Sequence, residues 1–524
     1  MSKKSKTSTF LLELPLQVTA HQAKHLRAHF EAARGLYNAL LGEAMKRLKL
    51  MRADPRWQQA RNIPKAEKQE RFALFSQLRQ EYGFSEYALH AYATSARTAW
   101  LADHIDSNTA QKLATRAYQA ANRVCLGQAR KVRFKSRGRG LDSVEGKNNK
   151  QGLRFVLQTP EEGNQGFLLW QQDRLAALID WDDPVIKHGL DQRIKYVRLI
   201  RRQASSPQAQ GADSAGYRYY AQLALEGVSY QKSKHRVGCA TIGLDLGPST
   251  IAIVPEVGEA RLLSFWSELK ADKRKKRRLE RKLDRQRRAN NPQNYDHKGR
   301  VKKGRLRWKD SRGYKATRRR LSSQDRKLAA HRKSLHGRLA HEVVACGNTI
   351  KTEKLSYKVW QKQYGKSVGT HAPGMFIELL KRTVARTGGI LHEVPPRSTK
   401  LSQYCHGCDS YAKKKLSERW HECACGIGPV QRDLYSAFLA CYLDLRTFVP
   451  SIAPASWESA ETRLQAAMED VVQRANAGEA LPQSMGMPRA RARLPQSPAS
   501  DHQELRYRHD RVEAVVRWQE PPAF

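Results

Sequence analysis

The sequence predicts a multidomain α+β protein, because helix-like and strand-like patterns occupy separate blocks of the chain. From His21 to about residue 50, apolar residues recur every three or four positions, which is typical of an amphipathic helix. Beyond residue 126, short alternating segments indicate strands, and after residue 237 both patterns mix around a cysteine cluster. A length of 524 residues agrees with two to four domains.

The first block is expected to be mainly helical and the second mainly β. A strand at 10–16 (FLLELPL) opens the chain, and a basic, glycine-punctuated loop at 131–140 follows the helical block. Further helices are expected at 65–82, 85–103 and 106–125. Further strands are expected at 153–158, 166–170, 194–200 and 217–225.

The third block begins with a predicted β-hairpin at 238–254 and continues into a strongly basic helical stretch at 263–345. Short strand and helix patterns return at 347–395. Two further helices are expected at 431–445 and 456–475. The following segment, ALPQSMGMPRARARLPQSPAS, is rich in Pro, Ser and Arg and is expected to be disordered.

The charge of the chain indicates a polyanionic partner. Lys and Arg number 95 against 50 Asp and Glu, a net charge of +45, far more than solubility requires, and such an excess favours nucleic-acid binding. No apolar run is long enough for a membrane span, and the N-terminal apolar patch is too short for a signal peptide. We therefore expect a cytoplasmic, nucleoid-associated protein with no membrane partner.

A cysteine cluster is the most specific motif. Fourteen residues separate two cysteine pairs, each on a short turn, as in a zinc ribbon, where four thiolates surround one structural Zn²⁺. The predicted ligands are Cys405, Cys408, Cys423 and Cys425. The second pair is C-x-C instead of C-x-x-C, so His406 or His421 could replace one thiolate. Unrelated cysteines are the alternative, but half of the chain's eight cysteines fall within these 21 residues.

Three carboxylates are candidate metal ligands, although each has an ordinary explanation. Asp245 leaves the apolar strand of IGLDLGPSTIAIV, where burial without a partner is costly, but a turn aspartate is common. Glu353 ends a short strand in NTIKTEKLSY, and exposed Glu is common. Asp433 lies in the first turn of a helix, where a negative charge complements the helix dipole.

In this order, with a basic helical insert before the second carboxylate and the cysteine pairs before the third, the motifs resemble the RuvC-like nuclease of transposon-encoded TnpB proteins and of compact type V CRISPR effectors. The likeness extends over about 20–445. Supporting segments are LRAHFEAARGLYNALL (26–41), VRFKSRGRGLDS (132–143), YRYYAQLAL (217–225), HRKSLHGRLAHEVV (331–344) and VPPRSTKLSQYCHGC (394–408).

The resemblance implies a helical recognition segment inserted in a β-barrel wedge domain, followed by a ribonuclease-H-like (RuvC) α/β nuclease with an inserted zinc ribbon. The expected boundaries are 1–20 and 126–236 for the wedge, 21–125 for the recognition segment, 237–395 for the nuclease with its basic insert at 263–345, 396–428 for the ribbon, 429–446 for the last motif and 447–524 for a partly disordered tail. We identify no counterpart of the tail beyond 450 in the family.

The resemblance also implies an activity, RNA-guided cleavage of double-stranded DNA by a metal-dependent endodeoxyribonuclease. Asp245 would bridge two Mg²⁺ ions, and Glu353 and Asp433 would complete their shells, because two divalent ions can both activate water and stabilise the leaving oxygen. A guide RNA would select the target DNA, and the protein would read a short adjacent motif. The resemblance leaves open whether the chain is a CRISPR effector or transposon-encoded, and whether it is a monomer or a homodimer.

The last motif departs from the family pattern D-R-D-x-N-A-A. Gln431 stands for the first Asp and Tyr435 for the Asn, which would alter metal affinity or rate. The alternatives are therefore a guided DNA-binding protein that represses without cutting, a DNA-only transposase, and a zinc-ribbon RNA-binding protein with incidental carboxylates.

Two basic segments are expected to contact nucleic-acid phosphates. The first is one face of a helix within 271–290, followed by aromatic residues among further Lys and Arg, and the second is the loop at 131–140, which the resemblance places on RNA or duplex. A charge run is often only a solvated face, but here acidic partners are scarce. The candidate residues are Arg277, Arg281, Arg285, Arg288, Lys131, Arg133, Lys135, Arg137 and Arg139.

Overall fold

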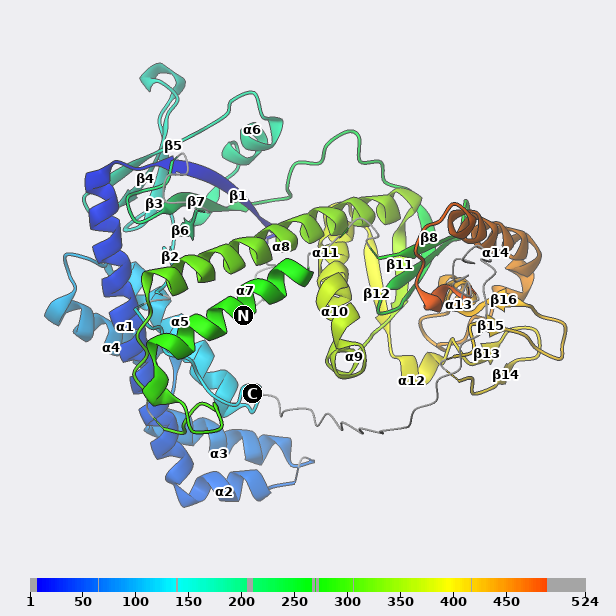
Figure 1. Ribbon diagram of the computed structural model, residues 1–524, viewed down its shortest axis with the longest axis horizontal. Coiled ribbons are helices and arrows are strands. Elements are labelled where there is room, and N and C mark those ends of the chain that lie inside the picture. Colours follow the sequence, from blue (N-terminus) through cyan, green and yellow to red (C-terminus); the bar gives the residue numbers. More distant parts are fainter. Residues whose placement is uncertain are drawn as a thin grey trace, which may run out of the picture.

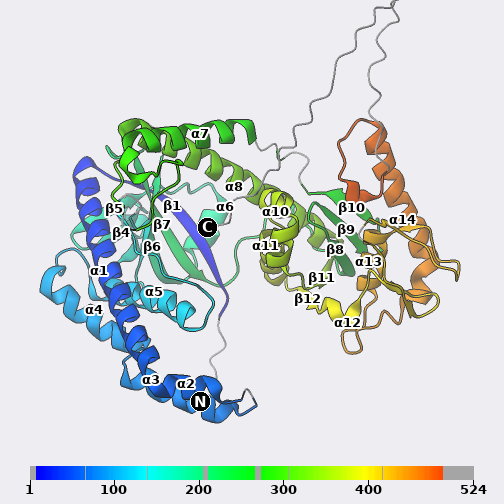
Figure 2. The same cartoon turned by 60° about the horizontal axis from the view of Figure 1, so that its bottom comes forward.

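The chain forms two lobes, a first lobe of helices and a curled sheet and a second lobe built on a smaller sheet (Figure 1; Figure 2). The long helix α8 (Arg312–Cys346) runs from one lobe to the other, with α7 (Lys273–Asn290) packed along its first half. The computed structural model describes residues 7–64, 66–137, 140–204, 211–265, 269, 273–304, 306–415 and 417–487.

The helices of the first lobe pack their apolar faces on one another. They are α1 (Ala20–Ala53), α2 (Pro55–Asn62), α3 (Lys68–Glu81), α4 (Glu86–Trp100) and α5 (Ser107–Cys125). A capping box starts α1, in which Thr19 accepts from the backbone N–H of Gln22 and the Gln22 side chain accepts from that of Thr19. Helix α2 was not predicted, because PRWQQARN contains too few apolar residues for a periodic pattern. Its start is nonetheless marked by Asp54 as N-cap and Pro55 at the first helical position.

The sheet of the first lobe is antiparallel, in the order β2-β6-β7-β1-β5-β4-β3. Its strands are β1 (Thr9–Gln17), β2 (Ser143–Glu145), β3 (Arg154–Leu157), β4 (Gly166–Trp170), β5 (Asp173–Ala177), β6 (Ile194–Gln203) and β7 (Tyr217–Glu226), and α6 (Pro184–Leu190) links β5 to β6. The expected β-barrel is corrected to a curled half-barrel, because β2 and β3 are its two edges within the described residues. The helices are inserted between β1 and the other strands, as the resemblance implied.

The sheet of the second lobe mixes antiparallel and parallel pairs, in the order β10-β9-β8-β11-β12. Its strands are β8 (Ala240–Leu246), β9 (Thr250–Pro255), β10 (Arg261–Ser264), β11 (Gly347–Glu353) and β12 (Ile390–Val394). The last two strands run parallel to β8, and β9 runs antiparallel to both of its neighbours. The edge strand β10 occupies the start of the stretch expected to be helical from residue 263, and the first described helix of the insert starts at Lys273.

Both faces of this sheet are covered. Along β9 the side chains alternate, so that Ile251 and Ile253 pack under α8 and α11 (Pro373–Arg386), whereas Ala252 and Val254 pack under α13 (Arg432–Cys441) and α14 (Ala453–Asn476). Shorter elements around the sheet are α9 (Tyr357–Gln363), α10 (Gly365–His371), α12 (Pro396–Thr399), and the strand pairs β13 (Tyr404–Cys405) with β14 (Ser410–Tyr411) and β15 (Trp420–His421) with β16 (Val430–Gln431).

The segment after α14 corrects one expectation. Residues 481–487 were expected to be disordered, yet Met485 is fully buried in the core under α13 and α14, and Leu481 and Met487 pack against the same core. Local composition could not reveal this, because the partners of these apolar residues are distant in sequence. The rest of that expected disordered stretch lies outside the described residues. Across the described ranges, no helix combines the length and apolarity that a membrane crossing requires.

Gly243→Ala should destabilise the second lobe. A Cβ atom at Gly243 would lie 1.8 Å from the carbonyl oxygen of Ala437 and 2.5 Å from the amide nitrogen of Cys441, so α13 would have to move off β8. We expect a loss of about 1–3 kcal/mol in the free energy of unfolding, measured by scanning calorimetry. Gly337→Ala is the control, because nothing lies within 4 Å of that position on α8, and it should be neutral or stabilising. Equal effects of the two substitutions would contradict the close packing.

Candidate active site and metal centre

The three candidate carboxylates line one cavity of about 710 Å³. Asp245 lies near the end of β8 and Glu353 ends β11, and because these strands are parallel neighbours, both side chains reach the same edge of the sheet. Asp433 approaches from the first turn of α13, which packs on β8 at Gly243. The fold therefore brings together residues that are 108 and 80 positions apart in sequence.

The cavity is electrostatically unfavourable for three negative charges. Burial raises the pKa of Asp245 well above its usual range, and the nearby Asp433 and Glu353 raise it further. Burial also raises the pKa of Glu353, against the hydroxyl of Thr399, which donates to its Oε1 at 2.8 Å. Burial likewise raises the pKa of Asp433, opposed by Arg432 and Arg419. A bound cation would relieve the repulsion between these groups.

Three cations that no sequence motif predicted line the same cavity. They are Lys414, Arg419 and Arg432. The Arg432 guanidinium lies 3.8 Å from the Asp433 carboxylate and donates to the carbonyl oxygen of Lys415 at 3.1 Å. Arg432 could have been predicted to line the cavity, because it is next to Asp433 in sequence. Lys414 and Arg419 reach the cavity only through the fold of the cysteine region. Carboxylates and guanidinium groups facing one space can hold metal ions and a phosphate together.

The four predicted cysteine ligands also come together. Their sulfur atoms all lie within 4.8 Å of one another, and in the described part of the chain they form the one group of three or more ligating residues gathered this closely. The Sγ atoms of Cys405 and Cys425 are 3.6 Å apart, and those of Cys408 and Cys423 are 3.5 Å apart. Four sulfurs around a tetrahedral zinc at about 2.3 Å would be separated by about 3.8 Å. The cluster therefore has the donors and spacing to hold a metal ion such as Zn²⁺, despite its short second pair.

Neither nearby histidine joins this cluster, because both are engaged around Tyr435. The Tyr435 hydroxyl contacts Nδ1 of His406 at 2.7 Å and accepts from its backbone N–H at 3.1 Å. The ring of His421 stacks on Tyr435 with centroids 4.1 Å apart, and Lys414 donates to its Nδ1. Tyr435, which looked like a loss from the family motif, thus ties α13 to the first cysteine turn.

Gln431, the other departure from the motif, is fully buried and has two partners. Its Oε1 accepts from the backbone N–H of Leu434 at 2.8 Å, which caps α13, and its Nε2 donates to the carbonyl oxygen of Ser484 at 3.2 Å. The segment 482–484 lines the cavity as well. The part of the tail that was expected to be disordered therefore contributes a wall of the site and a contact to the helix that carries Asp433.

The candidate phosphate contacts lie away from this cavity. Arg277, Arg281 and Arg285 are exposed on α7, and Arg288 is paired with Asp284 at 2.8 Å. Lys131, Arg133 and Arg137 are exposed in the loop, and Lys135 is half-buried, with its carbonyl oxygen accepting from Arg34 and Asn38 of α1. The predicted Arg139 lies outside the described residues. In the last turn of α7, the Arg287 guanidinium lies 3.7 Å from the centroid of the ring of Trp308, which follows the helix in sequence.

Comparison with known proteins gives structural neighbours only. No family model matches the chain, and no curated protein matches its sequence. A solved Cas12f1–sgRNA–target DNA complex is similar over 82% of this chain and 98% of its own, with 13% identity and a TM-score of 0.41. A CRISPR–Cas12f ternary complex is similar over 82% of both chains, with 12% identity and a TM-score of 0.25. Both neighbours are Cas12f-type CRISPR effectors, and compact type V CRISPR effectors are one of the two groups that the sequence motifs resemble. At TM-scores below 0.5 this likeness carries no argument, so the function rests on the residues of the site.

Cys405→Ser should remove bound zinc and destabilise the second lobe, because metal binding to such a cluster is coupled to folding. Zinc per chain by elemental mass spectrometry and the thermal midpoint are the two measurements. Cys239→Ser is the matched control, since Cys239 is exposed and outside the cluster. The assignment fails if Cys405→Ser retains the zinc content and melting temperature of the Cys239→Ser control.

Proposed function

We propose that the chain is an RNA-guided DNA endonuclease with a two-metal RuvC-like site. The observation that carries the proposal is the convergence of Asp245, Glu353 and Asp433 on one cavity, in a setting that raises the pKa of each. The strand order of the second lobe supports it, since an antiparallel meander with two added parallel strands is the arrangement expected of a ribonuclease-H-like nuclease.

Asp245, Glu353 and Asp433 would together hold two Mg²⁺ ions in this cavity. When bound, such ions activate a water molecule and stabilise the leaving oxygen of the phosphodiester. Arg432 and Arg419 would hold the non-bridging phosphate oxygens by charge-assisted hydrogen bonds. Thr399, which donates to Oε1 of Glu353, would keep the other carboxylate oxygen, Oε2, directed at the metals.

The cysteine cluster would hold one structural Zn²⁺, since four protein ligands leave no open position for a substrate. Through Tyr435 and His406 the cluster is joined to α13, so the metal would keep Asp433 in place. The cluster also positions Lys414 and Arg419 at the cavity. We therefore assign it a positioning role in the nuclease and no direct part in the chemistry.

The exposed arginines of α7 and the basic loop would bind phosphates of the guide RNA and of the RNA–DNA duplex. Helix α7 lies along α8, which joins the two lobes (Figure 1). A duplex on this face would be adjacent to both lobes, with the cavity of the second lobe available to a single strand. The family resemblance of the motifs identifies these partners as a guide RNA and target double-stranded DNA.

Asp245→Ala should abolish cleavage without abolishing DNA binding. The complex is purified with its co-expressed RNA and incubated with Mg²⁺ and a plasmid library that carries the RNA-matched target beside randomised flanks. We expect cleavage next to one flank motif by the wild type, a loss of at least about 100-fold in Asp245→Ala, and full activity in Glu259→Gln, an exposed carboxylate of the same lobe.

The outcomes distinguish the alternatives. Target retention without cutting by the wild type would favour the guided repressor. Absence of any defined RNA, with binding to a specific duplex, would favour the DNA-only transposase. Cleavage that survives in Asp245→Ala would contradict the assigned site.

A further inference from the structure

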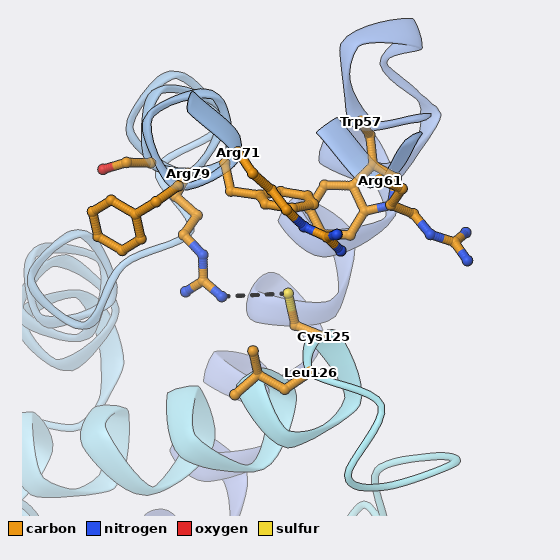
Figure 3. Close-up of a pocket in the computed structure, with 9 residues that line it drawn as sticks. Trp57, Arg61, Arg71, Arg79, Cys125 and Leu126 are labelled. Atoms are coloured by element: carbon orange, nitrogen blue, oxygen red, sulfur yellow. Dashed lines mark hydrogen bonds between the residues drawn. The ribbon is translucent and has the colours of Figure 1, made fainter. Parts of the chain in front are cut away.

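A second cavity, of about 610 Å³, lies on the first lobe between α2, α3 and the end of α5 (Figure 3). Its walls combine aromatic rings with arginines, and none of its lining residues is acidic. It belongs to neither site described above, and the sequence motifs do not identify it. We refer to it as the aromatic–arginine cavity.

The aromatic side of this cavity presents ring surface to the solvent. Trp57 of α2 is nearly buried and meets Phe75 of α3 edge to face, with centroids 4.8 Å apart. One turn before Phe75, Phe72 leaves 75% of its surface exposed. The exposed Phe72 ring, next to the packed rings of Trp57 and Phe75, offers a flat face on which another ring can stack.

The arginine side has unbalanced positive charge. Arg71 donates to the carbonyl oxygen of Ile63 at 3.2 Å and lies over the Phe75 ring, 5.8 Å from its centroid. Arg79 donates to Tyr118 and Asn122, so within the described residues neither arginine is paired with a carboxylate. The side chain of Arg61 makes no hydrogen bond or ion pair with the described residues and points outward at the rim (Figure 3). Because no carboxylate lines the cavity, its charge is complementary to an anion.

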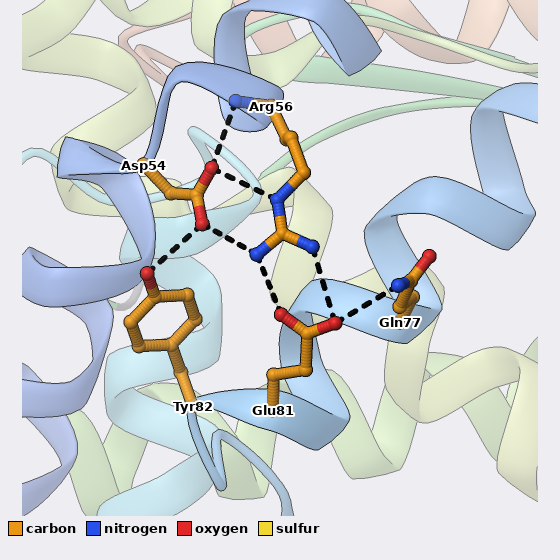
Figure 4. A network of polar contacts seen from close by, with 5 residues as sticks. All are labelled: Asp54, Arg56, Gln77, Glu81 and Tyr82. Atoms are coloured by element: carbon orange, nitrogen blue, oxygen red, sulfur yellow. Dashed lines mark hydrogen bonds and ion pairs between the residues drawn. The ribbon is translucent and has the colours of Figure 1, made fainter.

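The walls of the cavity are held in place before any ligand binds. The guanidinium of Arg56 at the start of α2 bridges Asp54 at 2.7 Å and Glu81 at the end of α3 at 2.6 Å, and the Tyr82 hydroxyl donates to Asp54 at 2.9 Å (Figure 4). This network fixes α2 against α3, and these two helices carry most of the lining residues. A preorganised cavity loses little entropy when it binds.

We propose that the aromatic–arginine cavity binds one unstacked nucleotide, with its base against Phe72 and Phe75 and its phosphate at Arg61. An apolar protein side chain would fill the aromatic side but leave the arginines unmatched, whereas a nucleotide provides both a π-face and an anion. The inference rests on the proposed function, because it requires a nucleic acid on the first lobe. It adds a site that holds a single extruded base at a distance from the cleavage chemistry.

The test is photocrosslinking with a single-stranded RNA of about 16 nucleotides that contains 5-iodouridine, and with the matching 5-iododeoxyuridine DNA. Crosslinked peptides are mapped by mass spectrometry on the full chain. We expect crosslinks at Trp57, Phe72 or Phe75, and the oligonucleotide that forms them identifies the source of the base as RNA or DNA.

Two variants separate the cavity from general charge. Phe72→Ala should weaken oligonucleotide binding by about 5- to 100-fold and should do so at low and high salt alike, because stacking is only weakly screened. Tyr87→Ala on α4, 84% exposed and outside the cavity, should have no effect. Arg61→Gln should reduce the slope of log affinity against log salt by about 1.

The proposal is overturned if the wild type binds the oligonucleotides but its crosslinks map outside the cavity and Phe72→Ala behaves as Tyr87→Ala does. That result would leave the proposed function intact. A wild type that binds neither oligonucleotide would overturn the proposed function together with the cavity. Because Phe72 is mostly exposed, its removal leaves the core of the lobe unchanged, and circular dichroism verifies this.

Discussion

The crowding of three carboxylates around one cavity, with Asp433 buried and Asp245 and Glu353 half-buried, is the constraint on which the second lobe depends, because Asp433 and Glu353 both oppose ionisation of Asp245. Each of Asp245, Glu353 and Asp433 lies on a strand or helix whose position is set by packing outside the cavity. The parallel pairing of β8 and β11 sets the first two, and the close approach of α13 to Gly243 sets the third. Because the fold holds three carboxylates at one edge of a sheet, a bound cation would stabilise it by reducing the repulsion between them.

The elements outside the cavity keep that geometry. Tyr435 joins α13 to the cysteine cluster, and Gln431 joins the start of the same helix to residues 482–484. Both residues depart from the motif that the sequence resembles, and both make hydrogen bonds within the protein. Neither is one of the three carboxylates, so the cavity keeps Asp245, Glu353 and Asp433.

Patterns that are local in sequence were predictable, and contacts between distant segments were not. The apolar spacing of Leu26, Phe30 and Leu40 indicated α1, and the paired cysteines indicated their own cluster. By contrast, Met485 is surrounded by Pro, Ser and Gly, so composition indicated disorder where the fold provides a core contact. The family resemblance allowed the three carboxylates to be assigned to one site. Lys414 and Arg419 could not be assigned to that site from the sequence, because only the folded cysteine region brings them to the cavity.

The most direct test of the carboxylate repulsion is the thermal midpoint of the second lobe with and without Mg²⁺, in the wild type and in Asp245→Asn. Because the pKa of Asp245 is raised in the fold, its ionised form destabilises the metal-free protein at neutral pH, and neutralising it should raise the midpoint by about 2–4 °C for each 1 kcal/mol released. Mg²⁺ should raise the midpoint of the wild type and leave that of Asp245→Asn nearly unchanged. A wild type indifferent to Mg²⁺, with Asp245→Asn no more stable than it, would show that carboxylate repulsion does not constrain this lobe.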